Sequence, residues 1–310
     1  MSSNYNWWNK LINNLLLKNK SSNNTLNNIS SKPEDIANFN SWICPNCKYS
    51  LDSSLNCKRC NFQGLNKNGL FYLHLMNEDW DDCVKEKNGW ISLHKKLGLY
   101  LDNPDHFFLP DGKPHLKKFY HAEKTAIDDV LQIEDFNNKT LLDIGVGTSW
   151  GDCYILKKVP RLKIIALECN DDPLIGLGRS QRLKEYHNCD YICLVADMHN
   201  IPIADNSIDI ILMRDSLHHS KAMKTVFKEV HRLLKRNGFF FAINEPYRKE
   251  EDNEKEVLRK FCEPELEHGI NERRPTKKEY LDSGSIINLR ILNNELDFNH
   301  QGLILFGKKS

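Results

Sequence analysis

The sequence lacks a membrane-spanning run, a secretory signal and a strong excess of charge of one sign. No apolar run approaches the roughly 20 residues that a membrane-spanning helix needs. The start, Met1-Ser2-Ser3-Asn4, lacks the basic stretch and the following apolar stretch of a secretory signal. Lys and Arg number 43 against 42 Asp and Glu, so the net charge of +1 gives no general attraction to phosphates. We therefore expect a soluble, cytoplasmic protein.

The cysteines do not follow the pattern of a disulfide-bonded protein. Six of the ten are scattered, whereas Cys44, Cys47, Cys57 and Cys60 form two C-x-x-C pairs. Two such pairs supply four thiolates, the number of ligands that structural zinc requires. The pattern predicts one zinc ion that is structural, because four protein ligands fill its coordination shell. Loss of this ion should unfold the segment, which is too short to hold a core without a metal, and should spare binding sites elsewhere.

Residues 1–40 contain 12 asparagines and many serines, a composition that predicts a flexible segment. Large apolar residues recur within it at helical spacing and form one stripe. They are Trp7, Trp8, Leu11, Ile12, Leu15 and Leu16. Such a helix could dock on its own protein, contact a partner or lie on a membrane surface. Lys10 and Lys18 are few charges for lipid binding.

An apolar strand followed by a glycine turn organises the rest of the chain. The run 140–144 predicts a short buried strand, and Gly145 and Gly147 follow it where the chain must turn into a helix. Glycine has no Cβ, so the backbone can take positive φ there and a ligand can approach closely. The helix should begin near Thr148, and its free N–H groups favour an anion. The dinucleotide pattern G-x-G-x-x-G would need glycine where the chain has Trp150.

Strands and helices alternate downstream of this turn. The next predicted strand, 162–167, is followed by Glu168. An acid at this distance from the glycine turn accepts the hydroxyls of a ribose in nucleotide-binding folds. Further strands are predicted over 191–195, 206–213 and 239–243, with a helix over 226–234.

The order of these motifs resembles that of the class I S-adenosylmethionine (SAM) methyltransferases. Asp-x-Gly-x-Gly at 143–147 resembles their motif I, and Ala-Asp-Met at 196–198 resembles their motif III. As a set, residues 120–246 are similar to the small-molecule enzymes of ubiquinone and menaquinone synthesis. The resemblance implies a Rossmann-like α/β fold with a seven-stranded sheet, preceded here by a small zinc ribbon. Its last two strands, an antiparallel pair, would be 286–292 and 303–306.

Two positions depart from the family pattern. Ser149 replaces a usual glycine, which is tolerable if Ser149 caps the following helix. Lys-Arg-Asn-Gly at 235–238 replaces Lys-Pro-Gly-Gly, and Asn-Gly can make the same turn. The Asn-Pro-Pro-Tyr signature of many amino-group methyltransferases is absent.

The resemblance implies a cofactor site at the carboxyl ends of the central strands. Asp197 would accept from the adenine amino group, the backbone N–H of Met198 would meet the ring, and Glu168 would hold the ribose. The predicted cofactor-binding residues are Asp143, Gly145, Gly147, Thr148, Glu168, Asp197, Met198 and Arg214. A catalytic metal is not required, because the sulfonium methyl group is already activated.

Candidate catalytic residues follow the next two strands, which open onto the same crevice. We predict that His218 or His219 acts as a base, since the ordinary pKa of histidine is about 6.5, and that Glu245 orients the substrate. Leu-His-His is also a frequent end to this strand in the family, so both histidines could be structural. Residues 268–274, ahead of the last two strands, are either a substrate lid or a surface turn.

We therefore expect a flexible segment (1–40), a zinc ribbon (41–66), a connecting helical and loop region (67–119) and a SAM-dependent methyltransferase domain (120–310). The predicted activity is methyl transfer to an O, N or C nucleophile of a small molecule or glycan intermediate. Two alternatives stay open. One is a ribosomal or transfer RNA methyltransferase, because one family of ribosomal RNA methyltransferases also carries an N-terminal zinc module. The other is a non-catalytic module whose fold only binds SAM.

Overall fold

The computed structural model describes residues 39, 41–100, 114–292 and 302–310, and in the helix that starts at Pro114 it describes side chains from Glu123 onward. Apart from Phe39, the predicted flexible segment lies outside the described residues, and so does its stripe of apolar residues. None of the helices in the described part of the chain combines the length and the apolar run that crossing a bilayer demands.

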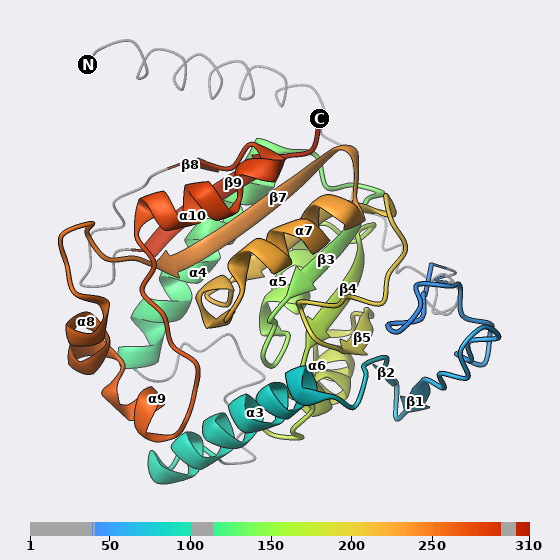
Figure 1. The fold of residues 1–310 in the computed structure, drawn as a ribbon, viewed down its shortest axis with the longest axis horizontal. Coiled ribbons are helices and arrows are strands. Elements are labelled where there is room, and N and C mark those ends of the chain that lie inside the picture. The colour runs from blue at the N-terminus through green and yellow to red at the C-terminus, as the bar shows by residue number, and fades with distance from the viewer. Residues whose placement is uncertain (1–38, 40, 101–113, 293–301) are drawn as a thin grey trace.

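A nine-stranded sheet runs through the molecule (Figure 1). Seven strands have the order β5-β4-β3-β6-β7-β9-β8, and β1 and β2 extend the sheet beyond β5. The strands are β1 (Leu65–Lys67), β2 (Leu70–Tyr72), β3 (Thr140–Ile144), β4 (Lys163–Glu168), β5 (Ile192–Val195), β6 (Ile208–Arg214), β7 (Leu234–Pro246), β8 (Arg290–Ile291) and β9 (Gly302–Lys308). β9 is antiparallel to both β7 and β8, whereas β3 to β7 are parallel. The predicted Rossmann-like sheet is therefore confirmed.

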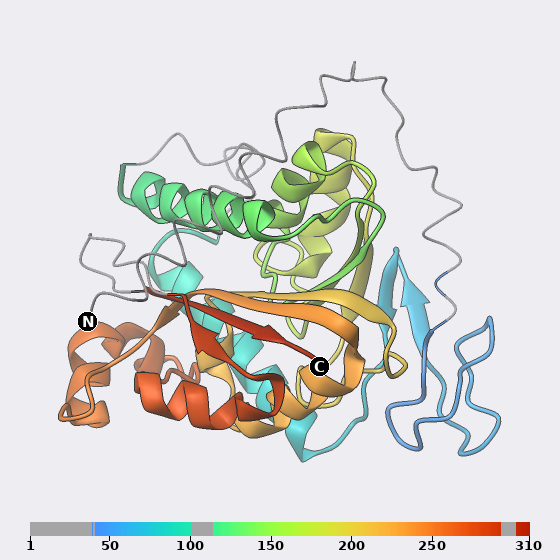
Figure 2. The ribbon, with the colours of Figure 1, turned by 90° about the horizontal axis from the view of Figure 1, so that it is seen from above.

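Helices cover both faces of the sheet (Figure 2). The helices α4 (Pro114–Ile133), α5 (Trp150–Lys158) and α6 (Ser180–His187) pack on one face, and α7 (Met223–Leu233) and α10 (Lys277–Ser283) pack on the other. Successive residues of a strand point to opposite faces. In β4, Ile164 and Ala166 accordingly pack in the core on the side of α4, α5 and α6. Ile165 and Leu167 pack in the core on the side of α7 and α10. Burial on both faces explains why the central strands are continuous apolar runs.

The hairpin of β1 and β2 was not predicted. β2 pairs in parallel with β5, and β1 pairs with β2 across a turn in which Asn68 and Gly69 both have positive φ, 53° and 76°. The hairpin spans the expected boundary between the ribbon and the connecting region. The cysteine-rich segment before it hydrogen-bonds to the loop after β5, because Ile43 N donates to Pro202 O at 3.1 Å and Ala204 N donates to Ser41 O at 2.8 Å.

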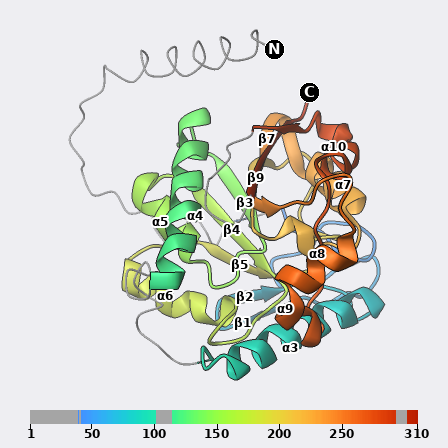
Figure 3. The ribbon, with the colours of Figure 1, turned by 90° about the vertical axis from the view of Figure 1, so that its left-hand side faces the viewer.

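A long helix, α3 (Glu78–Lys96), lies in the expected connecting region. The Asn77 side chain caps it by accepting from Trp80 N at 3.1 Å. Figure 3 shows α3 beside α9 (Glu263–Glu267), which follows α8 (Glu254–Phe261). Lys96 lies 3.0 Å from Glu267, and His268 Nδ1 lies 2.8 Å from Ser92 Oγ. These contacts join two segments that are far apart in the sequence.

The two positions that depart from the family pattern both adopt positive φ. Asn237 has φ 64°, so the Asn-Gly turn is possible, and β7 continues through it. Ser149 has φ 63° and occupies the N-cap position of α5, but its side chain makes no capping hydrogen bond. Instead, Ser180 Oγ donates to Ser149 Oγ at 3.2 Å. Ser149 thus does not meet the condition of capping the helix through its side chain, and its left-handed backbone is the conformation that glycine adopts most easily.

Candidate cofactor and active site

The loop after β3 leaves its backbone open on one side. Gly145 has φ 75°, and a Cβ there would lie 2.4 Å from the Ser216 Cβ. Gly147 has φ 55°, and a Cβ there would meet nothing within 4 Å. Gly145 N donates to Leu167 O at 2.8 Å, which fixes the loop against β4. Both glycines therefore have a backbone reason to be glycine, and the space beside Gly147 is free for a ligand.

Glu168 ends β4 and points its carboxylate at the glycine loop. Its Oε2 accepts from Gly147 N at 3.0 Å. Its Oε1 accepts from Cys169 N at 2.8 Å and from Asn170 N at 3.1 Å. These backbone donors hold the carboxylate in one orientation. Each oxygen can accept more than one hydrogen bond, so the carboxylate retains capacity for ligand hydroxyls.

Asp197 follows β5 and is held by its neighbour His199. The Asp197 Oδ1 accepts from His199 N at 2.9 Å and lies 2.7 Å from His199 Nδ1. The other ring nitrogen of His199 lies 2.8 Å from Ser220 Oγ. Both described contacts of the Asp197 side chain use Oδ1, which leaves Oδ2 as the oxygen that a ligand could use.

The described residues line an open cavity of about 240 Å³ at the carboxyl ends of β3, β4 and β5. It is lined by α3, by the strand ends, by the region after β6 and by the loop after α9. The lining residues include Asp79, Asp82, Cys83, Lys85, Glu86, Gly145, Glu168, Cys169, Asp197, Met198, His199, His219, Lys221, Gly269 and Asn271. Of the predicted cofactor residues, Gly145, Glu168, Asp197 and Met198 thus come together around one cavity. Gly147 lies beside it through its contact with Glu168.

Asp143 and Arg214 are in a different environment. The Arg214 Nε donates to Asp143 Oδ2 at 2.9 Å, and its Nη1 donates to Glu123. All three side chains are buried, and they are not among the described residues that line the cavity. A Cβ at Gly151 would lie 2.3 Å from Arg214 Nη1, so glycine there makes room for the guanidinium. Contact of Asp143 or Arg214 with a cofactor therefore stays a prediction, and the geometry gives them a supporting role behind the glycine loop.

Burial shifts the pKa values of this cluster. Burial raises the pKa of Glu123 to about 7, although the charge of Arg214 opposes the shift. Burial likewise raises the pKa of Asp143, against the attraction of Arg214. The pKa of Asp152 lies well above its ordinary value because of burial and the nearby charge of Asp143. Arg214 is thus the cation that allows this group of carboxyl side chains to be buried.

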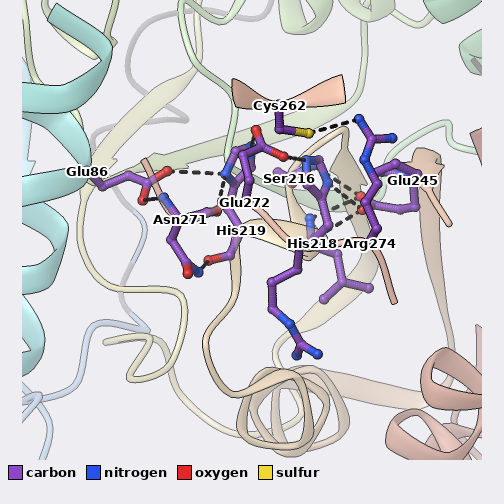
Figure 4. A network of polar contacts seen from close by, with 12 residues as sticks. Glu86, Ser216, His218, His219, Glu245, Cys262, Asn271, Glu272 and Arg274 are labelled. Atoms are coloured by element: carbon purple, nitrogen blue, oxygen red, sulfur yellow. Dashed lines mark hydrogen bonds and ion pairs between the residues drawn. The ribbon is translucent and has the colours of Figure 1, made fainter. Parts of the chain in front are cut away.

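The predicted catalytic residues separate into two environments (Figure 4). Glu245 is fully buried and accepts from the backbone N–H groups of Ser216, Leu217 and His218 at 3.0–3.1 Å. His218 Nδ1 lies 3.0 Å from Glu245 Oε2. These two side chains are not among the described residues that line the cavity, whereas His219 is.

The two adjacent histidines have opposite pKa shifts. Burial lowers the pKa of His218 to about 4, and the neighbouring charge of His219 contributes. Burial also lowers the pKa of His219, but Glu86 and Glu272 outweigh it and raise the pKa to about 9. The Nδ1 atom of His219 lies 2.8 Å from Asn271 O and 3.2 Å from Glu86 Oε1. The shorter contact is the hydrogen bond, so Glu86 acts on the ring mainly through its charge.

The four predicted zinc ligands form one cluster. Cys44 Sγ lies 3.3 Å from Cys60 Sγ, and Cys47 Sγ lies 3.5 Å from Cys57 Sγ. All four sulfur atoms lie within 4.8 Å of one another. Tetrahedral zinc with bonds of about 2.3 Å places its sulfur ligands about 3.8 Å apart. The cluster therefore fits a small zinc ribbon that encloses one ion.

Several residues around the cavity were missed from the sequence. On α3, Asp79, Cys83 and Glu86 line the cavity. Their spacings of four and three residues place them on one face of a helix, a signal that could have identified this face. His199 lies two residues after Asp197 and holds it, whereas Asn271 and Glu272 fall in the stretch predicted as a lid or a turn. Their position beside α3 depends on tertiary packing and has no local sequence signal.

Comparison with known proteins agrees with this fold. A methyltransferase domain model matches residues 142–242, from β3 into β7. The malonyl-[acyl-carrier protein] O-methyltransferase of Gallionella capsiferriformans (strain ES-2) is 29% identical over 104 residues, which are 32% of this chain and 34% of that protein. The demethylmenaquinone methyltransferase of Thermotoga maritima is 27% identical over 115 residues, which are 37% of this chain and 46% of that protein. The chain thus spans less than half the length of these two relatives.

Among solved structures, geranyl diphosphate C-methyltransferase from Streptomyces coelicolor A3(2) superposes with a TM-score of 0.52 at 13% identity, covering 76% of this chain and 99% of that chain. At this identity the likeness shows the fold alone. Together with the strand order, it confirms the class I methyltransferase sheet that the sequence predicts. The domain match and the sheet thus agree on a methyltransferase domain that includes residues 142–242.

Proposed function

We propose that the protein is a SAM-dependent methyltransferase that acts on a small-molecule acceptor. The observation that carries this proposal is the cavity at which Gly145, Glu168 and Asp197 meet. Open α/β sheets bind nucleotides in such a crevice at the carboxyl ends of the strands. The relatives are, by their names, enzymes for a malonyl group on acyl carrier protein and for demethylmenaquinone. Those names support a small acceptor group over RNA.

The residues around the cavity fit the parts of SAM. Glu168 would accept from the ribose hydroxyls, while its bond from Gly147 N keeps the glycine loop in place. Asp197 would use Oδ2 for the adenine amino group, and the backbone of Met198 would meet the ring. When bound, SAM supplies a methyl group on a positively charged sulfur, which an O, N or C nucleophile can displace.

We infer that positioning contributes most of the catalysis. His218 and Glu245 hold one another and the backbone after β6, so we assign them to supporting the cavity wall. His219 and Asn271 line the cavity and would contact the acceptor. Holding donor and acceptor in line for displacement can supply a large part of a reaction barrier. A separate base is needed only for an acceptor that carries a proton at neutral pH.

We also propose that the cysteine cluster binds one structural zinc ion, and that the protein is cytoplasmic. The zinc proposal rests on the four convergent sulfur atoms. The location rests on the cysteine pattern of the sequence, because structural thiol clusters are typical of reducing compartments.

Labelling of cell extract with SAM that carries a tritiated methyl group tests the function. We expect label in the small-molecule fraction or on an acyl carrier protein, and much less with Glu168→Ala protein. Label in the RNA fraction or in a glycan fraction would mean that the proposed acceptor is wrong and that the protein is still a methyltransferase. If the protein binds SAM in calorimetry and labels no fraction, the non-catalytic alternative is correct.

A further inference from the structure

Three side chains beside the cavity direct their ligand atoms into one small space (Figure 4). The Nε2 atom of His218 lies 3.6 Å from Glu272 Oε2, and the Nε2 atom of His219 lies 3.8 Å from Glu272 Oε1. One ligand atom from each of the three side chains lies within 4.8 Å of the others. The Glu272 side chain is 7% exposed and that of His218 is 5% exposed, so this carboxylate is buried between two imidazoles.

The distances are too long for hydrogen bonds, which end near 3.2 Å between N and O. They suit a bound ion better. A metal with bonds of about 2.0–2.2 Å to nitrogen and oxygen holds neighbouring ligands about 3.0–3.5 Å apart. The observed 3.6 and 3.8 Å lie just above that spacing.

The other nitrogen of each imidazole is already fixed. His218 Nδ1 lies 3.0 Å from Glu245 Oε2, and Glu245 is itself held by three backbone N–H groups. His219 Nδ1 lies 2.8 Å from the carbonyl oxygen of Asn271. Metal-binding histidines typically donate their second N–H to a carboxylate or a backbone carbonyl, which directs the other nitrogen to the metal. Both histidines have this arrangement.

The surrounding charge also favours a cation. Glu86 Oε1 is buried without a hydrogen bond and lies 3.2 Å from His219 Nδ1. Asp215 is close enough to both histidines and to Glu272 to interact with them through its charge. The positive charge of Arg274 near His218 disfavours a cation, and its Nη2 donates to Cys262 Sγ at 3.3 Å. Four carboxyl side chains therefore surround the site against this one arginine: Glu86, Asp215, Glu245 and Glu272.

We propose that His218, His219 and Glu272 bind a divalent transition-metal ion. Two imidazoles and one carboxylate suit zinc, iron(II) and similar ions, and the three ligands leave coordination positions open. This site differs from the cysteine cluster, whose four thiolates would fill the shell of their ion. Because His219 lines the cavity, the ion would lie in its wall. If the proposed function is correct, the open positions could hold an oxygen of the acceptor.

The zinc content of the full-length protein tests the proposal. The protein is dialysed against a zinc buffer at micromolar free zinc, and bound zinc is measured per chain. We expect Glu272→Gln to hold one zinc fewer than the wild type, since the substitution keeps the shape and removes the anionic ligand. The matched control is Glu267→Gln, because Glu267 is exposed and pairs with Lys96. It should hold as much zinc as the wild type.

Equal zinc in Glu272→Gln and in the wild type would overturn the proposal, as would equal losses in both glutamine variants. Thermal unfolding in chelator verifies that Glu272→Gln is folded. If it is not, His219→Gln takes its place in the same comparison. The readout is a difference in bound metal, so it requires neither methyl transfer nor zinc in the ribbon. A failure here is therefore distinguishable from a failure of the proposed function.

Discussion

At the scale of single residues, Glu168 connects the glycine loop to the cavity. It accepts from Gly147 N on one side and from Cys169 N and Asn170 N on the other. A ligand that occupies the cavity meets an acceptor already oriented by the backbone, so little ordering is left to binding.

Glu168→Ala should weaken SAM binding by about 100-fold or more, because two charge-assisted hydrogen bonds are each worth about 1.5–3 kcal/mol. Glu168→Gln should lose less, since one oxygen remains. Calorimetry with SAM measures both variants. Glu185→Ala is the control, because Glu185 is exposed on α6. Unchanged affinity in Glu168→Ala would remove this residue from the site.

Arg214→Met should lower the free energy of unfolding by about 3–5 kcal/mol, because it leaves Asp143 and Glu123 buried without their cation. The control is Lys158→Met, which removes the ion pair between Lys158 and Asp128. These side chains are 40% and 35% exposed, so this substitution should lower the free energy of unfolding by less than about 1 kcal/mol. Denaturant unfolding compares the two. A small loss in Arg214→Met would mean that the buried carboxyl groups are neutral without it.

The raised pKa of Glu123 predicts a pH dependence of stability. Its pKa rises from 4.5 to about 7 on folding, so the folded state binds more protons between these values. The folding stability that comes from this raised pKa is fully present below about pH 4.5 and is lost as pH rises through about 7. The stability difference between the wild type and Glu123→Gln should therefore fall by roughly 3 kcal/mol over this window. Unfolding measured from pH 4.5 to 8 would show a constant difference if Glu123 keeps an ordinary pKa.

At the scale of elements, the cysteine-rich segment is attached to the loop that follows β5. Ile43 N donates to Pro202 O, Ala204 N donates to Ser41 O, and Asn200 Nδ2 donates to Pro45 O. That loop begins with Asp197 and Met198, two of the proposed cofactor residues. The sequence led us to expect that loss of zinc would spare cofactor binding, and these contacts change that expectation.

Cys44→Ser combined with Cys57→Ser should therefore weaken SAM binding as well as abolish zinc in the ribbon. The reason is that the loop at 197–204 loses its backbone partners. Metal analysis and calorimetry on the same sample measure both effects. Tyr49→Ser, at an exposed ribbon residue, is the control. Loss of zinc with full SAM affinity would support the original expectation of two independent units.

At the scale of the whole molecule, local sequence signals predicted the sheet better than the packing around it. β3 was predicted with its observed bounds, because an apolar run beside glycines is a strong local signal. β1 and β2 were missed, since each has three residues; β2 pairs with β5, and β1 pairs with β2. Gly145, Glu168 and Asp197 could be placed at strand ends from the sequence. Two other features depend on contacts between distant segments, which no local pattern contains. One is the position of Glu272 beside His218 and His219, and the other is the ion pair between Asp143 and Arg214.

The short hairpin at one edge has a consequence for behaviour at high concentration. Unpaired strand edges are sites at which chains pair with one another and aggregate. Here the outermost described strands are β1, with three residues, and β8, with two. β1 ends in Lys67, so a charge lies on an already short edge. The long apolar strands β3 to β6 lie between these two ends. These two end strands of the described sheet therefore offer a second copy few backbone groups for pairing.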